Sequence, residues 1–204
     1  MKVGPRYKVC KRLGNGVYEK CQTQKFTLSE ARKKTRMTGR RPRQLSDYGK
    51  QLIEKQRVRV TYGITEKQLV KYVKGASQKK GSEVTAELLS TLERRLDNIV
   101  YRVGLAPTRR AARQMVVHGH ILVDGKKAAI PSHVIKEGEK ISVRDKSKDS
   151  SLFEAFKDRQ ADMSVPTWMT FNSKKMEATL KAEPTKDNTE TMFNLGVVME
   201  YYSR

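Results

Sequence analysis

The feature that most constrains the fold is a run of evenly spaced apolar residues between residues 85 and 103. Leucine, isoleucine and valine recur there at intervals of three and four residues, which places them on one side of an α-helix. We therefore predict one continuous helix over 85–103, ended by Gly104 and Pro107. Such a helix is stable only when its apolar side is packed, so this segment must belong to a core.

The residues that follow predict a second helix and a small antiparallel sheet. Thr108 can cap a helix that Gly119 ends. Residues 121–130 are two β-rich runs joined by an Asp-Gly dipeptide, which is a strong β-hairpin signal, and residues 137–143 predict a turn followed by a strand. The expected unit is therefore two helices packed on a small antiparallel sheet.

The remaining elements are predicted from turn and cap signals. Before residue 85 we expect turns over 1–28, a short helix over 29–37, a helix from Ser46 to Gly63, and a helix from the Thr65 cap to Gly81. After residue 146 we expect a helix over 151–162 and short strands at 167–171, 176–180 and 197–202.

Positive charge is concentrated at the start of the chain. Residues 1–80 hold 23 Lys and Arg against 5 Asp and Glu, a net charge of +18, whereas residues 147–204 have a net charge of −1. A field of one sign over so many residues attracts a polyanion. The basic part lacks a broad apolar side that could insert into a membrane, so we favour nucleic acid over a membrane surface.

The second predicted helix has a cationic side. Arg109, Arg110 and Arg113 lie opposite its apolar positions, and Lys126 and Lys127 follow in the hairpin. We expect these side chains to point outward and to contact phosphates of a folded RNA, since arginine binds phosphate through two parallel hydrogen bonds. The alternative is an ordinary helix with solvated arginines.

These motifs resemble a known family. Residues 92–146, which begin LERRLDNIVYRVGLAPTRRAARQMVVHG, resemble the RNA-binding domain of the S4 family of small-subunit ribosomal proteins. The resemblance extends to residues 1–7, 41–68 and 165–204, and so covers nearly the whole chain. One departure is that only Cys10 and Cys21 occur where many relatives have four zinc-binding cysteines. Another is Ala111, the third residue after the Thr108 cap, where relatives often have Glu.

The resemblance implies an α+β fold with four parts. These are a basic arm (1–45), a helical region (46–84), the RNA-binding domain (85–146), and a C-terminal helix with short strands that packs back on the helical region (147–204). It implies a non-enzymatic constituent of the small ribosomal subunit, located in the ribosome of a bacterial cytoplasm or an organelle. It also implies rRNA binding early in assembly, and a contact with a neighbouring ribosomal protein that influences decoding accuracy.

Site residues follow from the charge pattern and the resemblance together. The residues expected to bind rRNA are Lys2, Arg6, Tyr7, Lys8, Arg12, Arg109, Arg110, Arg113, His118, His120, Lys126 and Lys127. Those that the resemblance implies along the path where mRNA enters are Arg40, Arg41 and Arg43. We expect no membrane association and no homo-oligomer.

No metal ion or cofactor is expected. Cys10 and Cys21 lack the CxxC spacing and further ligands of a structural zinc site, so we interpret them as free thiols. His118 and His120 could suggest a metal pair, but no further ligand lies nearby in the sequence. We expect these histidines instead to contact RNA or to support the hairpin.

Two other functions compete with the structural one. Arg95-Leu96-Asp97 resembles the signature of pseudouridine synthases, RNA-modifying enzymes in which the aspartate is the nucleophile. Those enzymes carry a large catalytic domain after the RNA-binding domain, and the residues after 146 are too few to form one; we expect Asp97 to lie mid-helix on the surface. A double-stranded-DNA binder is disfavoured because no recognition-helix pattern with dimer signals occurs.

Overall fold

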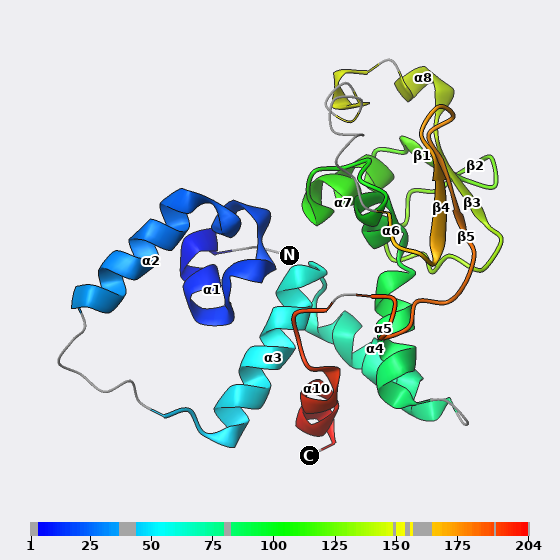
Figure 1. Ribbon diagram of the computed structural model, residues 1–204. Helices are drawn as coiled ribbons and strands as arrows, with labels where there is room; N and C mark the ends of the chain where they lie inside the picture. Colours follow the sequence, from blue (N-terminus) through cyan, green and yellow to red (C-terminus); the bar gives the residue numbers. More distant parts are fainter. Residues whose placement is uncertain are drawn as a thin grey trace. The chain divides into compact units, whose positions relative to one another are not determined.

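The computed structural model describes residues 4–36, 44–79, 83–148, 150–153, 156, 165–189 and 191–203. It divides into two compact units, Met1–Gln78 with Thr191–Arg204, and Lys79–Glu190 (Figure 1). The first unit is helical in its described residues, and the second combines helices with an antiparallel sheet. The predicted α+β class is confirmed.

The first unit begins with a helix that the sequence did not predict. Its elements are α1 (Arg6–Leu13), two short 3₁₀ helices (Asn15–Val17 and Glu19–Gln22), α2 (Gln24–Arg36), α3 (Asp47–Thr61), α4 (Glu66–Gln78) and α10 (Leu195–Tyr202). The expectation of turns over 1–28 was wrong. Helix α1 has no side-chain cap at its start, but it buries Cys10 and Leu13, and the Arg57 side chain of α3 donates to the Leu13 carbonyl. Tertiary contacts therefore stabilise this short helix.

Cys10 and Cys21 form a disulfide, so the interpretation as free thiols was wrong. Their Cα atoms are 6.4 Å apart, and the part of the chain that the structure describes holds no free cysteine. Both side chains are buried with Phe26 in a small separate core against which Tyr18 packs. The sequence did not indicate this pairing, because it depends on the two 3₁₀ helices, which fold the chain back and bring the two cysteines together.

Helices α3 and α10 pack together. The sequence correctly predicted a helix for α3 but wrongly predicted a strand for α10. The start of α3 is confirmed, because Ser46 Oγ accepts a hydrogen bond from the Gly49 N–H at 3.2 Å. The strand predicted at 197–202 was wrong: the segment is in α10, capped by Asn194, which accepts from the N–H groups of Gly196 and Val197. Its valine and tyrosine content favours a strand locally, but packing on α3 selects the helix.

A buried lysine links α3 to α4 and α10. Lys55 Nζ lies 2.9 Å from a Glu66 carboxylate oxygen and donates to Tyr201 Oη at 3.2 Å, while Tyr202 Oη donates to the same Glu66 oxygen at 2.6 Å. Burial alone raises the pKa of Glu66, but the hydrogen bonds from Tyr202 and Lys55 outweigh it and leave that pKa lowered. Burial and the bond to Glu66 raise the pKa of Tyr202. The cluster therefore holds an ionised Glu66 at neutral pH.

The second unit packs helices on a five-stranded antiparallel sheet. Its helices are α5 (Val84–Glu93), α6 (Leu96–Arg102), α7 (Arg109–Val117) and α8 (Asp145–Lys148). The sheet order is β2-β1-β3-β5-β4, with β1 (Ile121–Val123), β2 (Lys126–Lys127), β3 (Lys140–Val143), β4 (Met169–Asn172) and β5 (Glu177–Leu180). The predicted hairpin is confirmed: Asp124 and Gly125 both have positive φ, as its tight turn requires. The strands predicted at 137–143, 167–171 and 176–180 are confirmed as well.

The single helix predicted over 85–103 is interrupted. Arg95 pairs with Val134 in an isolated antiparallel bridge, flanked by hydrogen bonds from the Leu96 N–H to the His133 carbonyl and from the Ile135 N–H to the Arg94 carbonyl. Arg95 is consequently extended, and α5 ends before it while α6 starts after it. The apolar period continues across the break, which is why the sequence alone predicted one helix.

One core holds the second unit together. The apolar sides of α6 and α7 pack with the sheet strands and with Phe153, Phe156 and Trp168 into a single buried cluster. Strands β4 and β5 extend the sheet next to β3, so the residues after 146 supply this unit with strands and the first unit with α10. Most of the helix predicted over 151–162 lies outside the described residues, as does Gly81.

We predict that the disulfide stabilises the start of the chain. Replacing both Cys10 and Cys21 by Ser should lower the free energy of unfolding of the first unit by about 2–3 kcal/mol, because closing a loop of this length restricts the unfolded chain. Denaturant unfolding followed by circular dichroism measures the loss, and the parent protein in reductant should match the variant. Alkylation of both cysteines in the native, unreduced protein would contradict the disulfide.

We also predict a pH-dependent contribution from Glu66. Its folded-state pKa is lowered from the ordinary 4.5, so its charge stabilises the fold above pH 4.5, and this stabilisation disappears as the pH falls through the lowered value. Glu66→Gln should therefore unfold at a lower temperature than the parent at pH 7, and the two should converge in acid. A constant difference from pH 7 to pH 3 would contradict the role of the charge.

Candidate nucleic-acid interface

Helix α7 presents its cations because its opposite side is packed. Thr108 Oγ1 accepts from the Ala111 N–H at 3.1 Å, which confirms the predicted cap, and Ala112, Met115 and Val116 are buried in the core. The arginines of this helix must then lie on its outer side and flanks.

The three arginines of α7 do not share one environment. Arg110 is exposed, as predicted. Arg109 is only half-exposed: its Nε donates to Asn98 Oδ1 at 2.9 Å, and its guanidinium lies 4.4 Å from the centre of the Tyr101 ring. Arg113 is also half-buried, and its charge acts on Asp97. The expectation that all three simply point outward was therefore wrong for Arg109 and Arg113.

Lys126 and Lys127 lie on the exposed edge strand β2, next to the end of α7. A Cβ placed on Gly119, whose φ is +73°, would overlap the Lys127 side chain, so this lysine lies directly over the turn that ends the helix. His118, the last residue before that turn, is exposed. The structure thus brings Lys127 and His118 together at the C-terminal end of α7, where a helix carries partial negative charge and favours cations.

Two further cations at this end were missed by the sequence analysis. The Arg144 N–H donates to the His120 carbonyl, and His120 Nδ1 lies 3.0 Å from Ser147 Oγ, so the turn into α8 lies against His120. Arg144 is exposed on this turn, and Lys146 is exposed in the first turn of α8. The sequence could have indicated them, because they directly follow the predicted strand β3, which pairs with β1 and so places them beside the hairpin.

The acidic residues near these cations have hydrogen-bond partners of their own. Lys148 Nζ lies 2.8 Å from Asp145 Oδ1, and this hydrogen bond lowers the pKa of Asp145. Asp124 in the hairpin turn accepts a hydrogen bond from the Lys140 N–H at 2.9 Å. The carboxylates therefore have local structural roles, and the net charge of this surface is positive.

The first unit carries the other predicted rRNA contacts. Arg6, Lys8 and Arg12 are exposed on α1. Tyr7 is partly exposed, but its ring stacks on buried Phe26 at 5.6 Å between centroids, which limits the area left for a base. Lys2, Arg40, Arg41 and Arg43 lie outside the described residues.

Asp97, the residue of the competing enzyme interpretation, is buried rather than on a surface. It lies in the first turn of α6, and Arg95, which has no exposed surface, donates to its two carboxylate oxygens at 3.0 and 2.6 Å. Burial raises the pKa of Asp97 although Arg95 acts against this shift. The expectation of a surface position mid-helix was wrong because the chain breaks at Arg95. A carboxylate held by a buried arginine fork has a structural role.

Neither a metal centre nor a membrane segment is seen in the described ranges. The His118 and His120 rings are 6.1 Å apart between centroids, and among the described residues no three His, Cys, Asp or Glu side chains gather as they would around a metal ion. Of the helices in those ranges, none combines the length and apolar composition needed to cross a bilayer.

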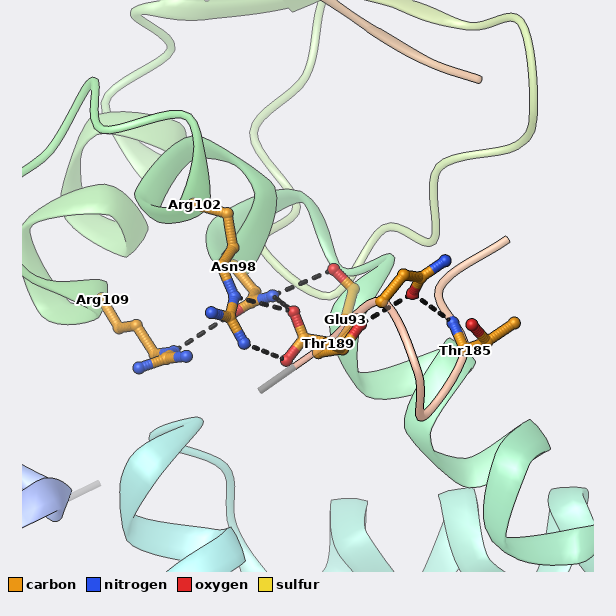
Figure 2. A network of polar contacts seen from close by, with 7 residues as sticks. Glu93, Asn98, Arg102, Arg109, Thr185 and Thr189 are labelled. Carbon is orange, nitrogen blue, oxygen red and sulfur yellow. Dashed lines mark hydrogen bonds and ion pairs between the residues drawn. The ribbon is translucent and has the colours of Figure 1, made fainter. Parts of the chain in front are cut away.

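A buried polar network connects the end of α5 with α6 and α7. Glu93, which has no exposed surface, accepts from Arg102 and from Asn98, and Asn98 in turn accepts from Arg109 (Figure 2). The sequence analysis missed this network, since Glu93 and Asn98 fall within the apolar repeat. It ties one cation of the candidate interface to the centre of the second unit.

Comparison with known proteins gives two family matches. Residues 2–94 match the ribosomal protein S4/S9 N-terminal domain, and residues 94–141 match the S4 domain. The two matches meet at residue 94, in the short non-helical segment between α5 and α6.

Individual relatives match over almost their full length. The chain is 42% identical to small ribosomal subunit protein uS4 of Halothermothrix orenii over 98% of both chains. It is 42% identical to the uS4 protein of Chloroflexus aurantiacus, over 99% of this chain and 98% of the relative, and 38% identical to that of Acetivibrio thermocellus, over 98% of each.

Proposed function

The chain belongs to the uS4 family of small ribosomal subunit proteins, and from this premise we propose that it binds small-subunit rRNA early and nucleates assembly of the subunit. Family membership itself makes it a structural constituent of the small subunit and not an enzyme, located in the ribosome, with rRNA and ribosomal proteins as partners. The pseudouridine synthase interpretation is accordingly set aside.

The observation that supports the rRNA proposal most is the cationic surface of the second unit. We define it by Arg110, Lys126, Lys127, Arg144 and Lys146, all exposed, together with the half-buried Arg109. Folded RNA is recognised through its shape and its phosphates, and basic side chains on rigid elements supply such contacts. The exposed cations Arg6, Lys8 and Arg12 of α1 add a second set within the first unit.

We predict that rRNA binding depends strongly on salt. If about ten phosphates are contacted, the logarithm of the binding constant should fall with the logarithm of salt concentration at a slope of roughly −7 to −9. Replacing Lys126 and Lys127 by Ala should reduce that slope by about 1–2. Filter binding to a small-subunit rRNA fragment, with footprinting to locate the protein, measures both effects.

The chain offers a matched control for this experiment. Lys71 and Lys74 are also an exposed lysine pair, but they lie on α4 of the first unit, outside both sets of cations defined above. Their replacement by Ala removes the same charge and should change the slope less. Equal effects of the two pairs, or a flat salt titration of the parent, would contradict the proposed interface.

We further propose, from the family resemblance, that the segment with Arg40, Arg41 and Arg43 lines the path where mRNA enters, and that a contact with a neighbouring ribosomal protein influences decoding accuracy. Replacing these three arginines by Ala should slow translation through messages with hairpins, because cations that hold the single strands are lost, while rRNA binding is retained. Reconstituted translation of structured and unstructured messages of equal length measures this. Equal rates on both messages would contradict the proposal.

A further inference from the structure

We propose that Glu93 and Asn98 are positioning residues that hold the Arg109 guanidinium ready for rRNA. Both are buried too deeply to reach a ligand, since Glu93 has no exposed surface and Asn98 is 2% exposed. The proposal deepens the proposed function and rests on it, because it takes Arg109 as an rRNA contact.

The positioning starts from the Glu93 carboxylate. Arg102 binds it with two parallel hydrogen bonds, from Nη2 to Oε1 at 2.8 Å and from Nε to Oε2 at 2.9 Å. Asn98 Nδ2 donates to the same Oε2 at 2.8 Å (Figure 2). Two charge-assisted contacts from Arg102 leave the carboxylate a single orientation, and hydrogen bonds of this kind are the strong ones in proteins.

The carboxylate in turn sets the orientation of the Asn98 amide. Asn98 Nδ2 also donates to the Glu93 carbonyl at 3.0 Å, so both groups on that side are acceptors and only the amide nitrogen can face them. The amide oxygen must then face the opposite way, where it accepts from Arg109 Nε at 2.9 Å. A rotated amide would place oxygen against two acceptors and its nitrogen against a donor.

Arg109 is held from two directions as a result. Its Nε is fixed by Asn98, and its guanidinium lies over the Tyr101 ring at 4.4 Å, a geometry that stabilises a cation. An unrestrained arginine side chain loses much rotamer freedom when it binds a phosphate. Because Arg109 is ordered before RNA arrives, its binding should cost less entropy than that of the exposed Arg110.

A double-mutant cycle tests this positioning role. Asn98→Leu keeps the side-chain size but cannot accept from Arg109, and it should weaken rRNA binding by about 3- to 10-fold, as expected for one hydrogen bond. In an Arg109→Ala background the same change should have no further effect. Dissociation constants are measured with the full chain and one small-subunit rRNA fragment, at a temperature where thermal unfolding shows every variant folded.

Arg110 provides the control, since it is the neighbouring exposed arginine, and the side-chain hydrogen bonds of Asn98 go to Glu93 and Arg109. In an Arg110→Ala background, Asn98→Leu should weaken binding as much as in the parent. If Asn98→Leu does not fold, Glu93→Gln enters the same cycle, because it keeps the shape and removes the charge that orients the amide.

The outcomes separate this inference from the proposed function. Unchanged binding by Arg109→Ala would overturn Arg109 as an rRNA contact, and the positioning role with it. Weakened binding by Arg109→Ala, with unchanged binding by both Asn98→Leu and Glu93→Gln, would overturn the positioning role alone. Equal weakening by Asn98→Leu with and without Arg109 would show a merely structural role and would also overturn it.

Discussion

Backbone pairing of Arg94–Leu96 with residues 133–135 determines how the second unit is built. These hydrogen bonds need an extended residue at Arg95, which an uninterrupted helix does not provide. The break redirects the chain, so that α6 packs with α7 and the sheet. It also turns polar side chains inward, because Glu93, Arg95 and Asp97 lie at the ends of the two helices that meet there. Buried charges are costly unless paired, and each of these has a partner.

The buried polar network and the cationic surface of the second unit are connected through two arginines of α7. Arg109 and Arg113 lie between them, each half-buried and each next to a group of the interior. Arg110 and Lys126 are exposed and contribute charge that solvent surrounds, whereas Lys127 lies over the turn that ends α7. Ordered cations define where a phosphate fits, and solvated ones raise the attraction at longer range. A folded RNA surface requires both.

Local signals allowed much of the fold to be predicted, and long-range contacts account for the rest. The Ser46 and Thr108 caps and the Asp-Gly hairpin involve neighbouring residues, so the sequence alone predicts them. Helix α10 was mistaken for a strand because its type depends on packing with α3, which is far away in the sequence.

In the candidate site as well, features that depend on neighbouring residues were predicted and features that depend on distant residues were not. Arg110, Lys126 and Lys127 were predicted to be exposed because solvated cations need no partner. The environment of Arg109 could not be predicted, because Asn98 was hidden within an apolar repeat and its amide orientation depends on Glu93. The disulfide was missed for a related reason, since two cysteines 11 residues apart meet only after the intervening turns have formed.

The first unit is discontinuous in the sequence, and this has a consequence for synthesis of the chain. Gln51 and Lys55 of α3 are buried and donate hydrogen bonds to Glu200 and Tyr201 of α10, which a translating ribosome adds after the second unit. The strands that the structure describes in the second unit have been made by then. The nascent chain can therefore complete the second unit before the first, because the contacts of α3 with α10 form only after α10 has been synthesised.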